Sequence, residues 1–177
     1  MTKLLCFDLF GTVIDMANVD RDELRAYGDF LAEWRRSRQW LPLELPESWA
    51  TLPAFHDARD GLELLAEKGY RCVTLSNAPL PLTRAMLRHN DLTFAGIVPL
   101  EATGAYKTDP ACYTFACALW GVPPCDAAMV TANRTFGDLE AAAGIGMRPI
   151  LIRDDTPCPA DHFTDILALA ESLPCLG

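Results

Sequence analysis

Short apolar runs alternate along the chain with stretches that have helical spacing. Five of the apolar runs predict buried strands because they carry few polar residues. They span residues 3–8, 71–76, 95–100, 128–132 and 149–152. Four stretches with helical spacing predict helices at residues 57–69, 81–90, 109–121 and 137–146. This alternation indicates an α/β fold, a Rossmann-like parallel sheet with helices on both faces.

Residues 16–54 interrupt the alternation. Within them, residues 19–40 predict a long amphipathic helix, and a proline-rich stretch without a strand pattern follows. The helix carries four apolar residues near one face, namely Leu24, Tyr27, Leu31 and Trp34. We therefore predict a small helical cap at residues 16–54, inserted after the first strand into a core formed by residues 1–15 and 55–177.

Length and charge narrow the classes of partner. The chain has 177 residues, 50% of them hydrophobic, which suffices for one core with an insertion. Its formal net charge is −9, whereas nucleic-acid binding needs a basic face. No apolar run approaches membrane-spanning length, and the start "MTKLLCFDLFG" lacks a secretory pattern. We expect a cytoplasmic protein without a nucleic-acid or membrane partner.

The seven cysteines include no C-x-x-C pair. Because their number is odd and no secretory signal is present, we expect reduced, packed thiols rather than disulfides. The chain has only three histidines, none of them near a pair of cysteines, so no zinc site is expected.

Polar residues follow several of the predicted strands. They are Asp8 with Gly11 and Thr12, Ser76 with Asn77, and Thr131 with Asn133. Ligands of open parallel sheets bind outside the carboxyl ends of the strands, so these side chains predict a site there. The alternative is that strand ends need turn formers, which these residue types also are. Their recurrence at successive strand ends favours a site.

Four segments together resemble the ordered motifs of the haloacid dehalogenase (HAD) superfamily. They are "FDLFGT", "VTLSNA", "YKTDPACY" and "MVTANRTFGDLEAAAGIGM". One such motif alone would be weak evidence, but four in order on matching strand ends are strong evidence. The resemblance implies a HAD-like α/β core and a hydrolase.

The resemblance assigns Asp8 as the nucleophile, since a carboxylate can attack carbon or phosphorus to form an ester. Thr12 would hydrogen-bond the Asp8 carboxylate or the substrate. Lys107 would keep Asp8 ionised, because a nearby cation favours the charged form. Taken alone, Lys107 would be interpreted as a solvated surface lysine.

Two further pairs of residues receive roles from the same resemblance. Ser76 and Asn77 would donate hydrogen bonds to a carboxylate, a phosphate or a leaving halide. Asn133 and Asp138 would position the water that opens the ester. Asn133 alone would be interpreted as a turn residue, and Asp138 has the alternative role of capping the following helix.

Phe10 departs from the phosphatase pattern of the superfamily, in which the residue two after the nucleophile is usually a second Asp that acts as general acid. Phe10 has no proton to give. The 2-haloacid dehalogenases instead carry an aromatic residue there, because a halide leaves without protonation. Phe10 is therefore expected in the substrate site, where it contributes shape and keeps water out.

The fourth motif has one feature of the dehalogenases and one of the phosphatases. Asn133 replaces the first of two acids that help to bind Mg²⁺ in the phosphatases, which weakens attraction for a hard cation. The dehalogenases likewise have Asn followed by Asp. However, the five-residue spacing from Asn133 to Asp138 is closer to that of the phosphatases.

The predicted cap is smaller than that of the haloacid dehalogenases. Three cap arginines are either substrate contacts or solvated charges on the helix face: Arg25, Arg35 and Arg36. Three tryptophans either close the pocket or bury the cap against the core: Trp34, Trp40 and Trp49. A reduced cap leaves the site open, or lets a second subunit of a homodimer cover it.

Three hypotheses about function follow. The leading one is a hydrolase that forms an Asp8 ester on a small acidic substrate, specifically a 2-haloacid, with no obligatory cofactor and no metal site. The second is a Mg²⁺-dependent phosphohydrolase in which Asp8, the Phe10 carbonyl and Asp138 hold the ion. The third is a non-catalytic HAD-like binding module, against which the retained Asp8 and Lys107 argue.

Overall fold

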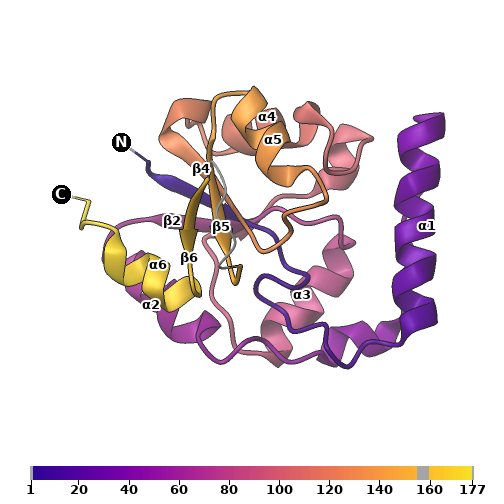
Figure 1. The fold of residues 1–177 in the computed structure, drawn as a ribbon, viewed down its shortest axis with the longest axis horizontal. Coiled ribbons are helices and arrows are strands. Elements are labelled where there is room, and N and C mark those ends of the chain that lie inside the picture. The colour runs from indigo at the N-terminus through magenta and orange to yellow at the C-terminus, as the bar shows by residue number, and fades with distance from the viewer. Residues whose placement is uncertain (1, 155–159, 177) are drawn as a thin grey trace.

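A computed structural model describes residues 2–154 and 160–176. The described residues form one parallel sheet of six strands in the order β3-β2-β1-β4-β5-β6. The strands are β1 (Leu4–Phe7), β2 (Arg71–Thr74), β3 (Gly96–Ile97), β4 (Ala127–Thr131), β5 (Arg148–Ile152) and β6 (Asp161–Phe163). The α/β fold with a parallel sheet is therefore confirmed (Figure 1).

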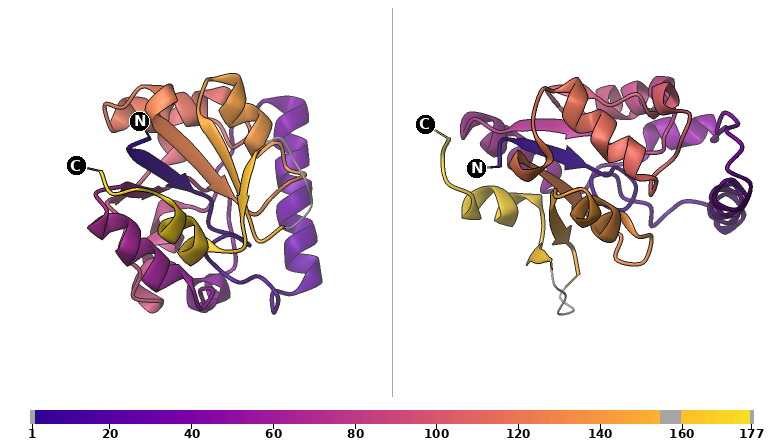
Figure 2. Two further views of the ribbon diagram at one scale, coloured as in Figure 1. Left: turned by 60° about the vertical axis from the view of Figure 1, so that its left-hand side comes forward. Right: turned by 90° about the horizontal axis from the view of Figure 1, so that it is seen from above.

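Helices cover both faces of this sheet (Figures 1 and 2). They are α1 (Arg21–Ser37), α2 (Ala58–Glu67), α3 (Leu80–His89), α4 (Pro110–Leu119), α5 (Asp138–Gly144) and α6 (Ile166–Ser172), with 3-10 turns at Glu47–Thr51, Leu100–Thr103 and Pro124–Asp126. No helix in the described part of the chain combines the length and hydrophobicity that a membrane crossing requires.

The core lies in two layers because side chains alternate along each strand. In β1, Leu5 and Phe7 belong to the cluster that packs against α2, α3 and α6. Leu4 and Cys6 belong to the other cluster, which packs against α4 and α5. All four side chains are fully buried, as expected for a central strand covered on both faces.

The sequence predicted five of the six strands and missed the last strand and helix. The strand expected at 95–100 is only two residues long, because residues Leu100–Thr103 form a 3-10 turn. Strand β6 is short and mostly exposed, so it lacks the apolar run that marked the other strands. Helix α6 follows it directly and buries Ile166 and Leu169.

The segment after β1 contains α1, which lies within the helix predicted at residues 19–40. Asp20 caps α1 by accepting hydrogen bonds from two backbone N–H groups of its first turn. Helix α1 stands apart from the sheet, beside the carboxyl ends of the strands (Figures 1 and 2). The division into a core and a cap stays a prediction.

Both ends of this segment leave the core side by side. Ile14 and Ala54 form an antiparallel bridge. The Asp15 N–H donates to the Pro53 carbonyl at 2.8 Å, and the Phe55 N–H donates to the carbonyl of Val13 at 3.0 Å. The segment is therefore a closed excursion whose entrance and exit are hydrogen-bonded to each other.

The cysteines of the described residues carry free thiols. Four of them are buried, namely Cys6, Cys72, Cys112 and Cys117, and two are exposed, namely Cys125 and Cys175. The expectation of packed thiols holds for the four buried cysteines and is wrong for the exposed Cys125 and Cys175. The seventh cysteine, Cys158, lies outside the described residues.

Candidate active site

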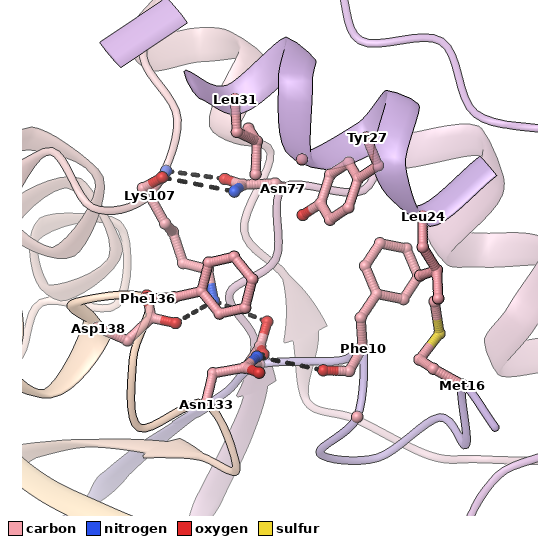
Figure 3. A pocket seen from close by; sticks show the side chains of 13 residues that line it. Phe10, Met16, Leu24, Tyr27, Leu31, Asn77, Lys107, Asn133, Phe136 and Asp138 are labelled. Carbon is pink, nitrogen blue, oxygen red and sulfur yellow. Dashed lines mark hydrogen bonds and ion pairs between the residues drawn. The ribbon is translucent and has the colours of Figure 1, made fainter. Parts of the chain in front are cut away.

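A cavity of about 350 Å³ lies between the carboxyl ends of the strands and α1 (Figure 3). Its polar side chains are Asp8, Asn77, Lys107, Asn133 and Asp138. Its larger apolar and aromatic side chains are Phe10, Met16, Leu24, Tyr27, Leu31 and Phe136. The strand ends thus bring together at least one polar residue from each of the four motifs.

Asp8 directly follows β1 and is 4% exposed. The Lys107 ammonium donates to its Oδ1 at 2.7 Å, and the Asn133 amide donates to Oδ2 at 2.7 Å. The Thr12 hydroxyl makes a longer contact with Oδ2, at 3.4 Å, and itself accepts from the Ala132 N–H at 2.9 Å. Both carboxylate oxygens of Asp8 are therefore held in fixed positions at the floor of the pocket.

Lys107 lies in the loop before α4 and is buried, so its interpretation as a surface lysine is wrong. Its Nζ lies 2.7 Å from the Asp8 carboxylate and 3.4 Å from that of Asp138. Asn77 orients the loop, because its Oδ1 accepts from the Lys107 backbone N–H at 2.7 Å. Burial alone would lower the pKa of Lys107, but the carboxylates of Asp138 and Asp8 raise it, so the side chain stays charged.

One ammonium therefore serves two buried carboxylates. Burial raises the pKa of the Asp8 carboxyl above its ordinary value. The charge of Lys107 opposes this rise, whereas the charge of Asp138 adds to it. Lys107 thus lowers the pKa of Asp8, as expected, but the rise caused by burial is larger.

Asp138 turns into the pocket rather than capping its helix. The N-cap position of α5 belongs to Gly137, whose φ of 87° is accessible to glycine at little cost. The Asp138 carboxylate instead accepts hydrogen bonds from the Tyr113 hydroxyl and from Lys107. The capping alternative is therefore wrong for Asp138.

Asn133 links the nucleophile position to the backbone of the first loop. Its Nδ2 donates to Asp8 and also to the Phe10 carbonyl, at 3.3 Å (Figure 3). Asp8, the Phe10 carbonyl and Asp138 are the ligands that the Mg²⁺ hypothesis requires. All of them accept hydrogen bonds from protein donors, and Lys107 supplies a positive charge beside the two carboxylates. The described residues also contain no group of three or more His, Cys, Asp or Glu that could hold a metal ion. The expectation that no metal is required stays a prediction.

Ser76 lies apart from the other polar residues. Its side chain is buried, and its hydroxyl accepts from the Ala78 N–H at 3.2 Å, as in a turn. It is not among the described residues that line the cavity. A contact between Ser76 and substrate stays a prediction.

Phe10 contributes an aromatic wall. Its ring meets Trp49 and Tyr27 edge to face, with centroid distances of 5.1 and 5.8 Å. The Trp49 indole N–H donates to the Glu23 carboxylate of α1 at 2.8 Å, which fastens the helix to this cluster. Trp34 packs against Tyr106. The cap tryptophans therefore bury the segment against the core and do not line the cavity described here.

None of the three candidate arginines is among the described residues that line the cavity. Arg25 pairs with Asp22, and Arg36 pairs with Glu33, both on the exposed surface of α1. Arg35 donates to the Phe136 carbonyl at 3.4 Å. Among the described residues, the cationic side chain that lines this cavity is Lys107.

Comparison with known families identifies the chain at the family level. A model of the haloacid dehalogenase-like hydrolases matches residues 33–146, more than half of the chain. The chain belongs to this hydrolase family. As a family member it is an enzyme, so the hypothesis of a non-catalytic module is set aside. The matched range begins after Asp8, so the first motif rests on the residues themselves.

One curated protein with a similar sequence is named as a haloacid dehalogenase. The (S)-2-haloacid dehalogenase 4A of Burkholderia cepacia is 29% identical over 138 residues, which cover 77% of this chain. The alignment spans only 59% of that relative. A named dehalogenase thus shares sequence with most of this family member, but much of the relative has no counterpart in the alignment.

Solved structures share the fold along nearly the whole chain. A dehalogenase in complex with an intermediate superimposes with a TM-score of 0.84 at 23% identity, covering 98% of this chain and 97% of the other. The L-2-haloacid dehalogenase of Xanthobacter autotrophicus with covalently bound chloropropionic acid gives 0.73 at 20%, covering 97% and 98%. A HAD phosphatase of Thermococcus onnurineus gives 0.69 at 23%, covering 97% of each chain. At these identities the likeness establishes the fold alone.

Three residues of this hydrolase were missed as site residues. Tyr113 lies inside the third motif and in the helix predicted at residues 109–121, but it received no role of its own. Burial and the Asp138 charge raise its pKa, so the phenol remains a hydrogen-bond donor. Tyr27 was assigned only to the apolar face of α1, yet its hydroxyl points into the pocket (Figure 3). Phe136 stands alone as a large apolar residue in a polar loop, which is a usable signal.

Proposed function

We propose that this hydrolase displaces a halide from a 2-haloacid through an ester formed on Asp8. A carboxylate oxygen of Asp8 attacks the carbon that bears the halogen. The carbon–halogen bond breaks, and the halide departs with the bonding electrons. The observation that carries this proposal is the buried Asp8 carboxylate facing a pocket in which the aromatic Phe10 offers no proton.

Hydrolysis of the ester completes the reaction. Water attacks the Asp8 carbonyl carbon, and the bond between that carbon and the ester oxygen breaks. The ester oxygen stays on the substrate carbon and becomes the hydroxyl oxygen of the product. The products are a hydroxy acid, halide and a proton, and Asp8 regains its carboxylate with one oxygen from water. Asn133 and Asp138 lie on the pocket wall, where they can orient that water. Thr12 and Asn133 hold the carboxylate in position.

The proposal places the acid group of the substrate at the polar end of the pocket. Lys107 supplies positive charge there, and Asn77 supplies an amide. No metal enters the scheme, because the Asn133 amide and the Lys107 ammonium already supply the donors that face Asp8. We therefore expect EDTA to leave the activity unchanged.

The test measures halide release from 2-haloacids and phosphate release from phosphomonoesters, each with Mg²⁺ and with EDTA. Asp8→Asn should abolish halide release, because an amide of similar shape is a poor nucleophile. Asp60→Asn, the same change at an exposed position of α2, should retain it. A covalent ester should add the substrate's mass, less the halide, to the parent protein under single turnover. Metal-dependent phosphate release without any halide release would overturn the proposal.

A further inference from the structure

The pocket has two chemically distinct ends, which Figure 3 shows side by side. We call the floor the four side chains that meet beyond the strand ends: Asp8, Lys107, Asn133 and Asp138. We call the roof the three larger side chains of α1 that line the cavity, Leu24, Tyr27 and Leu31; Gly28 of the same helix also lines it. The wall between them adds Phe10, Met16 and Phe136. Apart from the Tyr27 hydroxyl, the side chains of the roof and wall are therefore apolar.

We propose that the preferred substrate carries an extended alkyl or aryl tail that lies against the roof and Phe136. This inference rests on the proposed function for its reactive end. The inference goes beyond the proposed function because the substrate is an amphipathic 2-haloacid with a long tail rather than a short-chain acid. Its reacting carbon would still meet Asp8.

The size of the pocket supports a tail. A cavity of about 350 Å³ falls in the range of sites that enclose ligands larger than a short acid. A molecule such as 2-chloropropionate would satisfy the floor and leave the apolar roof in contact with water. Removing that water is favourable in proportion to the apolar area covered. Added carbon atoms would therefore strengthen binding until the roof is covered.

The rim of the pocket gives an independent observation. Leu24 is 36% exposed and Phe136 is 45% exposed, although both are large hydrophobic residues. Both line the cavity, one from α1 and one from the loop before α5. Contiguous apolar surface next to a polar site marks a binding surface. A tail between these two side chains would cover both.

The wall behind the tail is held in place by packing. Phe10, Tyr27 and Trp49 form a cluster of three edge-to-face ring pairs. Arg35 of α1 donates to the Phe136 carbonyl, which ties the rim loop to the helix. An ordered apolar wall loses little freedom when a ligand binds, so the gain from covering it is retained.

The experiment measures kcat/KM for a series of 2-bromoalkanoates from bromopropionate to bromooctanoate. Burying a methylene gives about a fourfold gain in affinity, so kcat/KM should rise by a few-fold per carbon until the roof is filled. Leu24→Ser and Phe136→Ser should each flatten this rise. Leu119→Ser is the matched control, because Leu119 is 50% exposed on α4 and does not line the cavity. It should keep the parental slope.

A binding arm separates failure of the tail site from failure of the chemistry. Calorimetry compares unbrominated hexanoate with propionate on the parent protein and on Phe136→Ser. Tighter hexanoate binding that Phe136→Ser removes supports the tail site, even where no halide is released and the proposed function fails. Halide release that is flat or falls with chain length overturns the tail site and leaves the proposed function standing. Equal flattening by Leu119→Ser also overturns it.

Discussion

The floor of the pocket is largely buried and hydrogen-bonded, whereas its roof is mainly apolar, with Leu24 partly open to solvent. The floor residues Asp8 and Asn133 follow central strands of the sheet, and their polar atoms are paired with one another. The roof lies on α1, which is fastened by side chains such as the Trp49 indole on Glu23. This difference in burial and hydrogen bonding suggests separate roles for the floor and the roof. Under the two proposals above, the floor carries out the reaction and the roof selects the substrate.

This comparison makes a general prediction about substitutions. A change in the floor should slow all substrates by a similar factor, because each substrate meets the same reacting groups. A change in the roof should reorder substrates, because it alters only the apolar contact with the part that does not react.

Trp49→Ala should have the largest effect, because Trp49 packs against Phe10 of the wall, close to Asp8 in the chain, and against Tyr27 of the roof. The side chain is 1% exposed, so its removal leaves a cavity that should cost about 3–5 kcal/mol of unfolding free energy. Urea denaturation measures the loss. Trp40→Ala, at a partly buried tryptophan of the same segment, should cost clearly less. Equal losses of unfolding free energy in the two variants would contradict the proposed supporting role of Trp49.

Lys107→Met should lower kcat/KM by roughly ten- to a hundredfold, the value of losing a hydrogen bond between charged groups. The order of substrates should stay the same, since Lys107 belongs to the floor. The measurement is kcat/KM over the bromoalkanoate series. Lys3→Met serves as control, because Lys3 is exposed. A loss below twofold, or a reordering of substrates, would break the proposed division of roles.

Acidity should affect activity and stability in opposite directions. Activity needs ionised Asp8, so kcat/KM should rise with pH through a pKa that burial has raised above the usual carboxyl range. The folded protein keeps the Asp8 proton to a higher pH than the unfolded chain does. The contribution of Asp8 to stability is therefore present below the unfolded pKa and is lost as pH rises through the folded pKa.

Profiles of kcat/KM and of the urea midpoint against pH test this opposition. In Lys107→Met the acid limb of kcat/KM should move to still higher pH, because the opposing cation is gone. Asp8→Asn should remove the matching component from the stability profile. An acid limb at the pH of an ordinary exposed carboxyl would contradict the role of burial.

Arg35→Gln should have the smallest effect. Arg35 is exposed and makes a 3.4 Å contact with the Phe136 carbonyl, so its loss should change stability by no more than about 0.5 kcal/mol. KM for short haloacids should also stay within about twofold, with Arg25→Gln as the matched control. A rise in KM of more than tenfold for Arg35→Gln alone would show that the cap supplies a cation to the substrate.

The floor could be predicted from sequence because parallel strands end at one edge of a sheet. Asp8 and Asn133 each follow an apolar run, so their convergence needs only the topology. The orientation of Asp138 was beyond that reasoning. It depends on Gly137 occupying the cap position and on Tyr113 donating from another helix.

The roof and the chain's end were harder to predict. Tyr27 has the spacing of a core residue, and only the gap between α1 and the strand ends turns its hydroxyl toward a cavity. Strand β6 has two exposed residues out of three, so no apolar run marked it. The direction of the Asp8 pKa depends on how fully the pocket excludes water, which charges along the sequence do not reveal.

The hydrogen-bonded neck of the cap segment has a consequence for how such enzymes diversify. Ile14 and Ala54 lie beside each other, so whatever joins them starts and ends at one point of the core. Closing a longer excursion from such a point costs little, about 0.6 kcal/mol for each doubling of its length. We therefore expect that the segment between Ile14 and Ala54 can be exchanged without disturbing the core. Splicing a different helix or a larger bundle between these two residues would give the same catalyst a new range of substrates.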